Sequence, residues 1–242
     1  MRAGEPVAGL EEVASVLAVA AHPDDLDFGC AATLARFVDA GARVGELVVT
    51  RGDSGSSDPG MTRERLREIR TREAQAAADA VGADLVLLDR LDGEVVHDID
   101  LRRDISREMR RVRPEVLVVL DPSPLIGDAF INHPDHRAVA QAALDSVITG
   151  ASTRLIFPEL AEEGLEPHKP TVILMIRPRV ADNNFAVDVT ATIDRKVKAL
   201  AAHASQVGDR DVASMVRDWA RSVGEAHGMD YAESFHRIDV TN

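Results

Sequence analysis

The chain has 242 residues, which is enough for one large α/β domain or two small ones. A formal net charge of −13 opposes nucleic-acid binding, because that binding depends on Lys and Arg neutralising phosphates. No apolar run approaches the length that crosses a bilayer. The start of the chain lacks a basic segment and Cys30 is the single cysteine, so we expect no secretory signal, no internal disulfide and a cytoplasmic location.

The first 150 residues alternate between apolar runs typical of buried strands and segments of helical composition. Strands are predicted over residues 15–21, 44–50, 84–88 and 115–120. Helices are predicted over residues 28–40, 62–81, 99–112 and 134–149, with Thr62 as an N-cap and Gly41 and Gly82 at helix ends. This alternation predicts a parallel sheet with right-handed crossovers.

The last third of the chain is less regular. Strands are predicted near 171–176, 185–189 and 234–240, and helices over about 192–202 and 211–226. No linker or change in composition sets this part off, so we predict one domain over 1–242. The expected fold is α/β: a Rossmann-like three-layer sandwich with a mostly parallel sheet and an irregular C-terminal extension.

One tripeptide occurs twice, each time after a predicted strand and before a predicted helix. His22-Pro23-Asp24 extends to Asp25, and His133-Pro134-Asp135 extends to His136. In the common doubly wound order 3-2-1-4 the first and fourth strands are neighbours, so both motifs should face one crevice at the carboxyl ends of the strands. The turn after the first strand is bulky and acidic where a dinucleotide site needs glycines, so we expect no NAD site.

These residue types suit a hydrolytic metal centre, since catalytic zinc takes three protein ligands from His and Asp or Glu and leaves one position for water. His22 and Asp25 lie three residues apart and can bend around one ion from a turn. Pro134 fits the first position of a helix, which makes His133 the expected cap. His133 and His136 should project from one side of that first turn, where one can bind the metal while the other faces substrate.

The other polar residues at this edge suit amide hydrolysis by a metal-activated water. Asp24 is the natural general base, and a protonated His133 can stabilise an oxyanion or protonate a leaving amine. Asp135 is expected to orient His133. Arg51 and Asp53 follow the second strand and are candidates for holding sugar hydroxyls or a phosphate, although a charged glycine turn explains them equally well.

The segment AHPDD at 21–25, together with HPDH at 133–136, resembles the motifs of the PIG-L/LmbE-like N-deacetylase family. The resemblance runs almost end to end, with support from TRGD at 50–53, the segment 70–73, VDVT at 187–190 and HASQ at 203–206. Leu26-Asp27 stands where many members have a Glu, so Asp27 is expected to replace that Glu with a shorter reach. Outside the two main motifs, His203 and Gln206 are expected to cap and pack a helix end rather than touch substrate.

The resemblance implies a zinc-dependent hydrolase that removes acetyl from N-acetylglucosaminyl groups of small conjugates. It implies His22, Asp25 and His136 as metal ligands. It further implies Asp24 as the base and His133 as the electrostatic partner of the tetrahedral intermediate.

Two alternative functions retain the metal site but differ in the reaction. An amidase acting on a larger thiol or sugar conjugate would use the same metal, and the loops that would decide it, 54–61 and 121–132, carry no pattern typical of a particular substrate. A metal-binding scaffold without turnover would bind the ion and release no acetate, and the presence of both Asp24 and His133 argues against it. Two imidazoles and a carboxylate accept Zn²⁺ or Fe²⁺, and the sequence is compatible with a homo-oligomer without specifying one.

Overall fold

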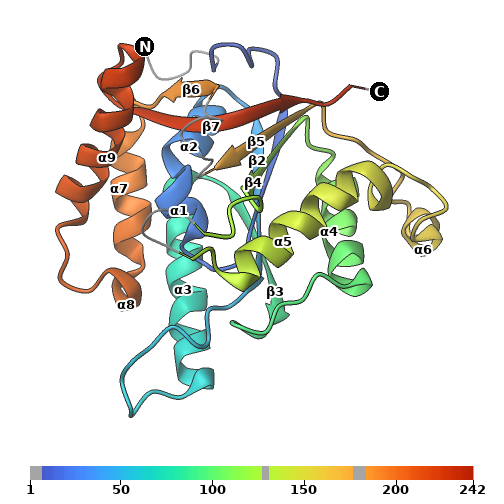
Figure 1. Cartoon of the computed structure of the whole chain (residues 1–242), viewed down its shortest axis with the longest axis horizontal. Helices are drawn as coiled ribbons and strands as arrows, with labels where there is room; N and C mark the ends of the chain where they lie inside the picture. The colour runs from blue at the N-terminus through green and yellow to red at the C-terminus, as the bar shows by residue number, and fades with distance from the viewer. Residues whose placement is uncertain (1–6, 127–130, 177–183, 242) are drawn as a thin grey trace.

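The computed structural model describes residues 7–126, 131–176 and 184–241. A seven-stranded sheet in the order β3-β2-β1-β4-β5-β7-β6 forms its middle layer (Figure 1). Strands β1 to β5 run parallel, and β7 is antiparallel to both β5 and β6. The strand bounds are β1 Ser15–Ala20, β2 Arg43–Thr50, β3 Asp84–Arg90, β4 Val116–Leu120, β5 Val172–Ile176, β6 Phe185–Asp188 and β7 Ala232–Asp239.

Helices cover both faces of the sheet. One side carries α1, α2, α3, α7, α8 and α9, and the other carries α4, α5 and α6 (Figure 1). Their bounds are α1 Asp25–Gly29, α2 Ala31–Asp39, α3 Arg63–Val81, α4 Ile99–Val112, α5 Pro134–Asp145, α6 Pro158–Glu162, α7 Ile193–Ala202, α8 Ala204–Val207 and α9 Val212–His227. A single π-helical turn, η1 (Ser146–Gly150), continues α5. No helix of the described ranges is both long and apolar enough to cross a membrane.

Strand β1 is buried on both of its faces, which explains why its sequence is apolar without alternation. Val16 and Ala18 belong to the hydrophobic core on the α2 side of the sheet. Leu17 and Val19 belong to the second core, on the α4 side. The strand is therefore held rigidly between two cores, and the turn that follows it has a fixed starting point.

The predicted strand order 3-2-1-4 is confirmed, as is the helix over 99–112. Thr62 caps α3 by accepting the Arg65 N–H at 3.2 Å, and Gly82 ends that helix at φ +82°. The less regular last third adds β5, β7 and β6 to the same sheet, close to the predicted positions.

Three local features differ from the prediction. The helix expected over 28–40 starts earlier, at Asp25, and is divided at Cys30 into α1 and α2. The helix expected to run to residue 149 ends its α-helical part at Asp145. Helices α6 and α8, four or five residues long, were too short to give a periodic pattern.

Candidate metal centre

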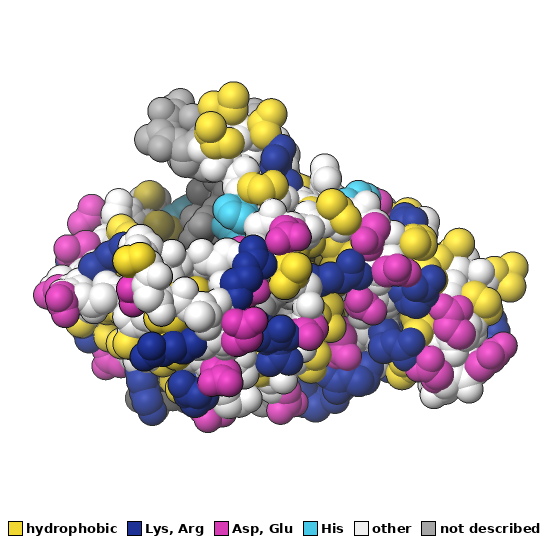
Figure 2. Space-filling model, turned by 90° about the horizontal axis from the view of Figure 1, so that it is seen from below, with side chains coloured by type: hydrophobic (Ala, Val, Ile, Leu, Met, Phe, Trp, Pro, Cys, Tyr) yellow, Lys and Arg dark blue, Asp and Glu magenta, His cyan; other side chains and the backbone are white. Residues whose placement is uncertain are grey.

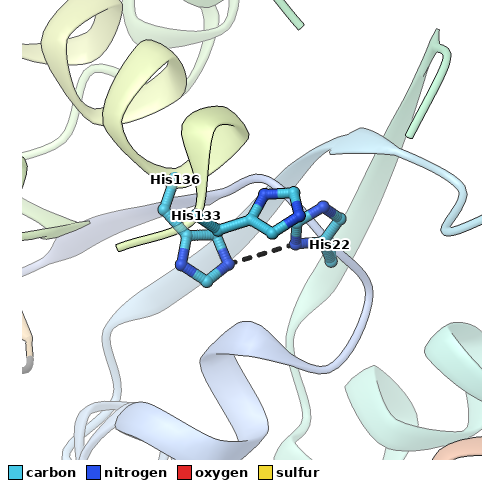
Figure 3. A group of neighbouring side chains, drawn as sticks. All are labelled: His22, His133 and His136. Carbon is cyan, nitrogen blue, oxygen red and sulfur yellow. Dashed lines mark hydrogen bonds between the residues drawn. The ribbon is translucent and has the colours of Figure 1, made fainter. Parts of the chain in front are cut away.

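The two His-Pro-Asp motifs meet at the carboxyl ends of β1 and β4, which are paired in parallel. The first motif forms the turn between β1 and α1. The second begins α5: His133 is the N-cap, its Nδ1 accepts the Asp135 N–H at 3.2 Å, and Pro134 takes the first helical position as predicted. Figure 3 shows the rings of His22, His133 and His136 gathered in one place, although more than a hundred residues separate the two motifs.

Donor atoms of three residues lie close together, with Asp25 contributing a different carboxylate oxygen to each of the two histidines. His22 Nδ1 and His136 Nε2 are 3.1 Å apart, and His136 Nε2 is 3.0 Å from Asp25 Oδ1. His22 Nδ1 is 3.5 Å from Asp25 Oδ2. Two ligand atoms of a tetrahedral zinc ion, each about 2.0–2.1 Å from the metal, lie roughly 3.3 Å apart, so the three residues fit such an ion.

His133 offers an alternative third donor, because the ring nitrogens of His22, His133 and His136 also lie within 4.8 Å of one another. The cap contact decides how His133 is protonated: an Nδ1 atom that accepts a backbone N–H leaves the proton of a neutral ring on Nε2. Burial and then the neighbouring His22 charge lower the pKa of His133 below its ordinary value. His133 is therefore better suited to donate a hydrogen bond from Nε2 than to bind an ion, which leaves Asp25 as the third candidate donor.

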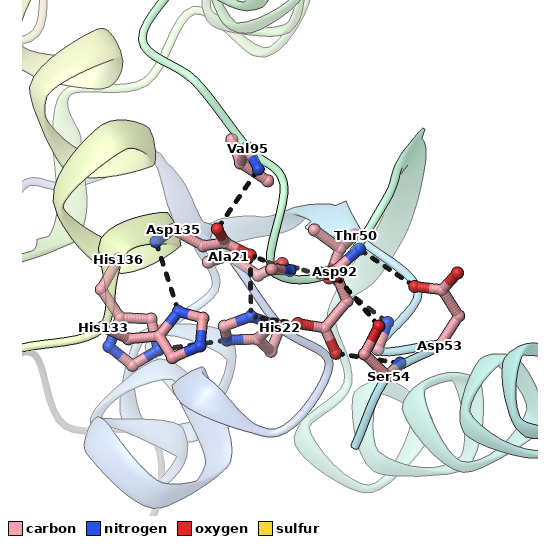
Figure 4. A network of polar contacts seen from close by, with 12 residues as sticks. Ala21, His22, Thr50, Asp53, Ser54, Asp92, Val95, His133, Asp135 and His136 are labelled. Atoms are coloured by element: carbon pink, nitrogen blue, oxygen red, sulfur yellow. Dashed lines mark hydrogen bonds and ion pairs between the residues drawn. The ribbon is translucent and has the colours of Figure 1, made fainter. Parts of the chain in front are cut away.

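The second nitrogen of His22 faces two carboxylates (Figure 4). His22 Nε2 lies 3.1 Å from Asp92 Oδ1 and 3.3 Å from Asp135 Oδ2. Burial disfavours a charge on His22, but its hydrogen bonds to Asp135, Asp25 and Asp92 outweigh this and raise the pKa of His22 to about 12. Carboxylates in this position fix the ring so that Nδ1 faces the donor atoms of His136 and Asp25.

The position of Asp135 corrects an expectation from the sequence. Its carboxylate was expected to orient His133, but it contacts His22 and accepts the N–H groups of Gly93 at 2.7 Å and Val95 at 3.2 Å. Only its backbone N–H meets His133. The reason is geometric, since the cap places the His133 ring against the helix terminus while the Asp135 side chain points into the loop after β3.

Asp92 did not emerge from the sequence as a site residue. It follows β3 as Asp92-Gly93, a pattern ordinarily typical of a turn. Asp53 Oδ1 accepts the Asp92 N–H at 2.9 Å, and Asp92 Oδ2 accepts the Ser54 N–H at 3.3 Å. These contacts bring the loop after β3 to His22 (Figure 4).

Asp24 is held by a buried arginine. Arg70 of α3 donates from Nη2 to Asp24 Oδ1 at 2.8 Å and from Nη1 to the Gly52 carbonyl. Gly52 has φ +65°, and a Cβ there would overlap the Arg70 guanidinium. Asp24 makes no capping hydrogen bond to α1, so its second carboxylate oxygen is available to other groups in the site.

A pocket of about 340 Å³ opens beside the three donor residues. Its polar part, which we call the polar lobe, is lined by Asp24, Ser54, Arg70, Asp92 and Gln206. Gln206 was expected only to pack a helix end, but it contributes to this lining.

The two residues proposed from the sequence to hold substrate do not line the polar lobe among the described residues. Arg51 bonds Asp89 and Thr71 and faces a separate hollow beside α3. Asp53 is buried and supports Asp92, with Arg63 on its other oxygen. Gly52, with its positive φ, separates the two and allows their side chains to diverge.

Asp27 lies behind the metal centre rather than in it. It is buried and accepts from His203 Nε2 at 2.7 Å, so the α1 turn is joined to the end of α7. His203 is fully buried, as expected of a packing residue.

A cluster of His and Asp donors at the carboxyl ends of a doubly wound sheet, with a further carboxylate beside it, is typical of a metal-dependent hydrolase. Residues 17–147 match the PIG-L family model, described as GlcNAc-PI de-N-acetylase, and the chain belongs to this family.

Similar proteins extend this relationship over nearly the whole chain. Diacetylchitobiose deacetylase of Thermococcus kodakarensis is 27% identical, with 94% of this chain and 84% of the relative aligned. The 1D-myo-inositol 2-acetamido-2-deoxy-alpha-D-glucopyranoside deacetylase of Nakamurella multipartita is 30% identical, with 80% of each chain aligned. The solved structure of N,N'-diacetylchitobiose deacetylase from Pyrococcus horikoshii has a TM-score of 0.85 and 26% identity, covering 95% of this chain and 85% of the other.

Proposed function

We propose that the protein is a metal-dependent hydrolase that removes the N-acetyl group from a small N-acetylglucosaminyl-type substrate, and that residues 1–242 form one deacetylase domain. The observation that carries the proposal is the convergence of His22 Nδ1, Asp25 and His136 Nε2 within 3.0–3.5 Å of one another, beside a pocket that contains Asp24. The names of the three similar proteins described above support the reaction, because all three are deacetylases of an N-acetylated sugar.

Zn²⁺ is the proposed ion at His22, Asp25 and His136, and Fe²⁺ is accepted by the same donors. When bound, the ion would supply Lewis acidity that activates water and polarises the amide carbonyl. Asp25 is suited to the ligand role because it is ionised: burial acts to raise its pKa, but contacts with His136 and then His22 hold the pKa of Asp25 well below its usual range.

Asp24 is the proposed general base. Arg70 fixes one of its oxygens at 2.8 Å, which leaves the other to take the proton from the attacking water and later to pass it to the leaving amine. Because Arg70 is itself buried and anchored to the Gly52 carbonyl, the carboxylate keeps its orientation through the reaction.

His133 is the proposed donor to the oxyanion that develops from the amide carbonyl. Its Nδ1 is engaged by the helix N-terminus, so Nε2–H is the group available to the substrate. A neutral ring performs this role, which refines the protonated form expected from the sequence.

The proposal is tested by measuring acetate release from a panel of N-acetylglucosamine derivatives before chelation, after chelation, and after re-addition of Zn²⁺ or Fe²⁺. We expect release from at least one member that disappears on chelation and returns with the metal. Stoichiometric metal binding without release from any member would refute deacetylation and support the non-catalytic scaffold or the larger-conjugate amidase. Release that resists chelation would refute metal dependence.

A further inference from the structure

A second pocket, of about 280 Å³, adjoins the metal centre. It shares His133 and His136 with the first pocket, so the two histidines form a wall common to both pockets. Its other lining residues come from the end of β4 and from the loop that leads to α5. We call this part the apolar lobe: Leu120, Asp121, Pro124, Ile131 and Asn132.

The polar groups of the apolar lobe are largely engaged within the protein. Asp121 Oδ1 accepts the Ser123 N–H at 2.8 Å, and the Asn132 amide donates to the Asp121 carbonyl at 3.3 Å. Both residues are buried. The surface left for a ligand is therefore mainly aliphatic, from Leu120, Pro124 and Ile131.

The mouth of this lobe carries hydrophobic side chains that the described protein does not cover. Ile131 is 77% exposed and Ile126 is 69% exposed. They form a β-bridge, and the Leu125 carbonyl accepts the Asn132 N–H at 3.0 Å, so the two sides of the loop are held together. Figure 2 shows hydrophobic side chains gathered on a projection of the surface with a histidine beside it. Apolar groups gathered at the mouth of a pocket are typical of a site that accepts an apolar ligand group.

We infer that the apolar lobe binds an uncharged alkyl or aryl group attached next to the scissile amide, while the polar lobe holds the sugar. This inference rests on the proposed function. At about 30 Å³ for a water-sized group, the pocket of about 280 Å³ holds roughly nine heavy atoms. The Asp121 carboxylate in its lining disfavours a carboxylate or phosphate on the same substituent.

Two substrate series distinguish the two places where such a group can be attached. In the first, the N-acetyl group is kept and the glycosidic substituent is lengthened from methyl to butyl, hexyl and octyl. In the second, the methyl glycoside is kept and the N-acyl group is lengthened from acetyl to butyryl and hexanoyl. We expect kcat/KM to rise about two- to fourfold per methylene in one series, the upper value being that of full burial, and then to level off. A carboxylate at the end of the chain should remove the gain.

A pair of variants tests the apolar lobe specifically: Ile131→Asn changes its lining, and Ile148→Asn is the control. Ile131 and Ile148 are both largely exposed, so neither change should unfold the protein, and Ile148 lies in η1 outside the pocket lining. Ile131→Asn should lower the ratio of hexyl to methyl activity at least fivefold, and Ile148→Asn should leave that ratio unchanged.

The outcomes separate this inference from the function on which it rests. Turnover of the methyl N-acetylglucosaminide with no gain in either series would overturn the apolar lobe and leave the deacetylase intact. An equal effect of Ile131→Asn and Ile148→Asn on the ratio would overturn it as well. Failure to turn over any member, with metal bound, would refute the proposed function itself.

Discussion

The Asp135 carboxylate offers the sharpest test of how the metal centre is held. It is completely buried and serves three groups: the N–H of Gly93, the N–H of Val95 and Nε2 of His22. Asp135→Asn keeps the shape of the side chain but removes its charge. It also replaces one acceptor oxygen by an NH₂ group, which then faces another hydrogen-bond donor. Loss of such an outer contact costs about 10- to 100-fold in metal affinity.

The structure places the expected loss of metal affinity near the lower end of this range. Asp92 still holds His22 Nε2 at 3.1 Å when Asp135 is changed, so the single variant should lose about tenfold. The double variant with Asp92→Asn should lose more than the product of the two single effects, because no carboxylate then orients the ring. The free energy of unfolding of metal-free Asp135→Asn should fall by about 1–3 kcal/mol, because the buried Val95 N–H loses its acceptor.

Competition with a chromophoric chelator measures the metal affinity, and urea unfolding of the metal-free protein measures the stability. Glu108→Gln is the matched control, since Glu108 is a buried carboxylate that pairs with Arg111 away from the site. A metal affinity within twofold of wild type in Asp135→Asn, together with a loss of turnover, would refute the reasoning. It would mean that Asp135 acts through His133 instead.

Three further predictions follow from the site. Metal binding at pH 7 should release about one proton, because the pKa of about 12 keeps both nitrogens of His22 protonated without metal. Calorimetry in two buffers of different ionisation enthalpy measures the number of protons released, and a value of zero would contradict the ligand set. Because the pKa of His133 lies below its ordinary value of 6.5, a neutral ring that donates from Nε2 should keep kcat level as the pH rises above about 6.5. A fall in kcat as the pH rises through that range would instead indicate a protonated donor. Gly52→Ala should displace Arg70 and lower kcat on the order of 10²-fold with metal affinity retained. The control for that change is Gly41→Ala, which has a similar positive φ but no neighbour within 4 Å, and an equal loss there would argue for backbone strain alone.

The convergence of His22 and His136 could be predicted because it depends on strand order rather than on local geometry. Alternating strands and helices make the first and fourth strands neighbours, and that pairing is observed between β1 and β4. The cap at His133 could also be predicted, because a proline at the first helical position places the residue before it at the N-cap.

Asp92 could not be predicted in the same way. It follows β3, which is separated from β1 by β2, so strand order alone does not bring it to His22. Its approach depends on the contacts of one loop with Asp53 and Ser54. The direction of the Arg51 side chain likewise depends on dihedral angles near Gly52 that the sequence leaves open.

The central claim is that Asp24 takes the proton from water activated at the metal centre. The most direct measurement compares acetate release by wild type and Asp24→Asn at equal bound metal, with Asp58→Asn, in an exposed loop, as the control. The account predicts a loss of about 10²- to 10⁴-fold in kcat for Asp24→Asn with metal content unchanged. Turnover within twofold of wild type would contradict it.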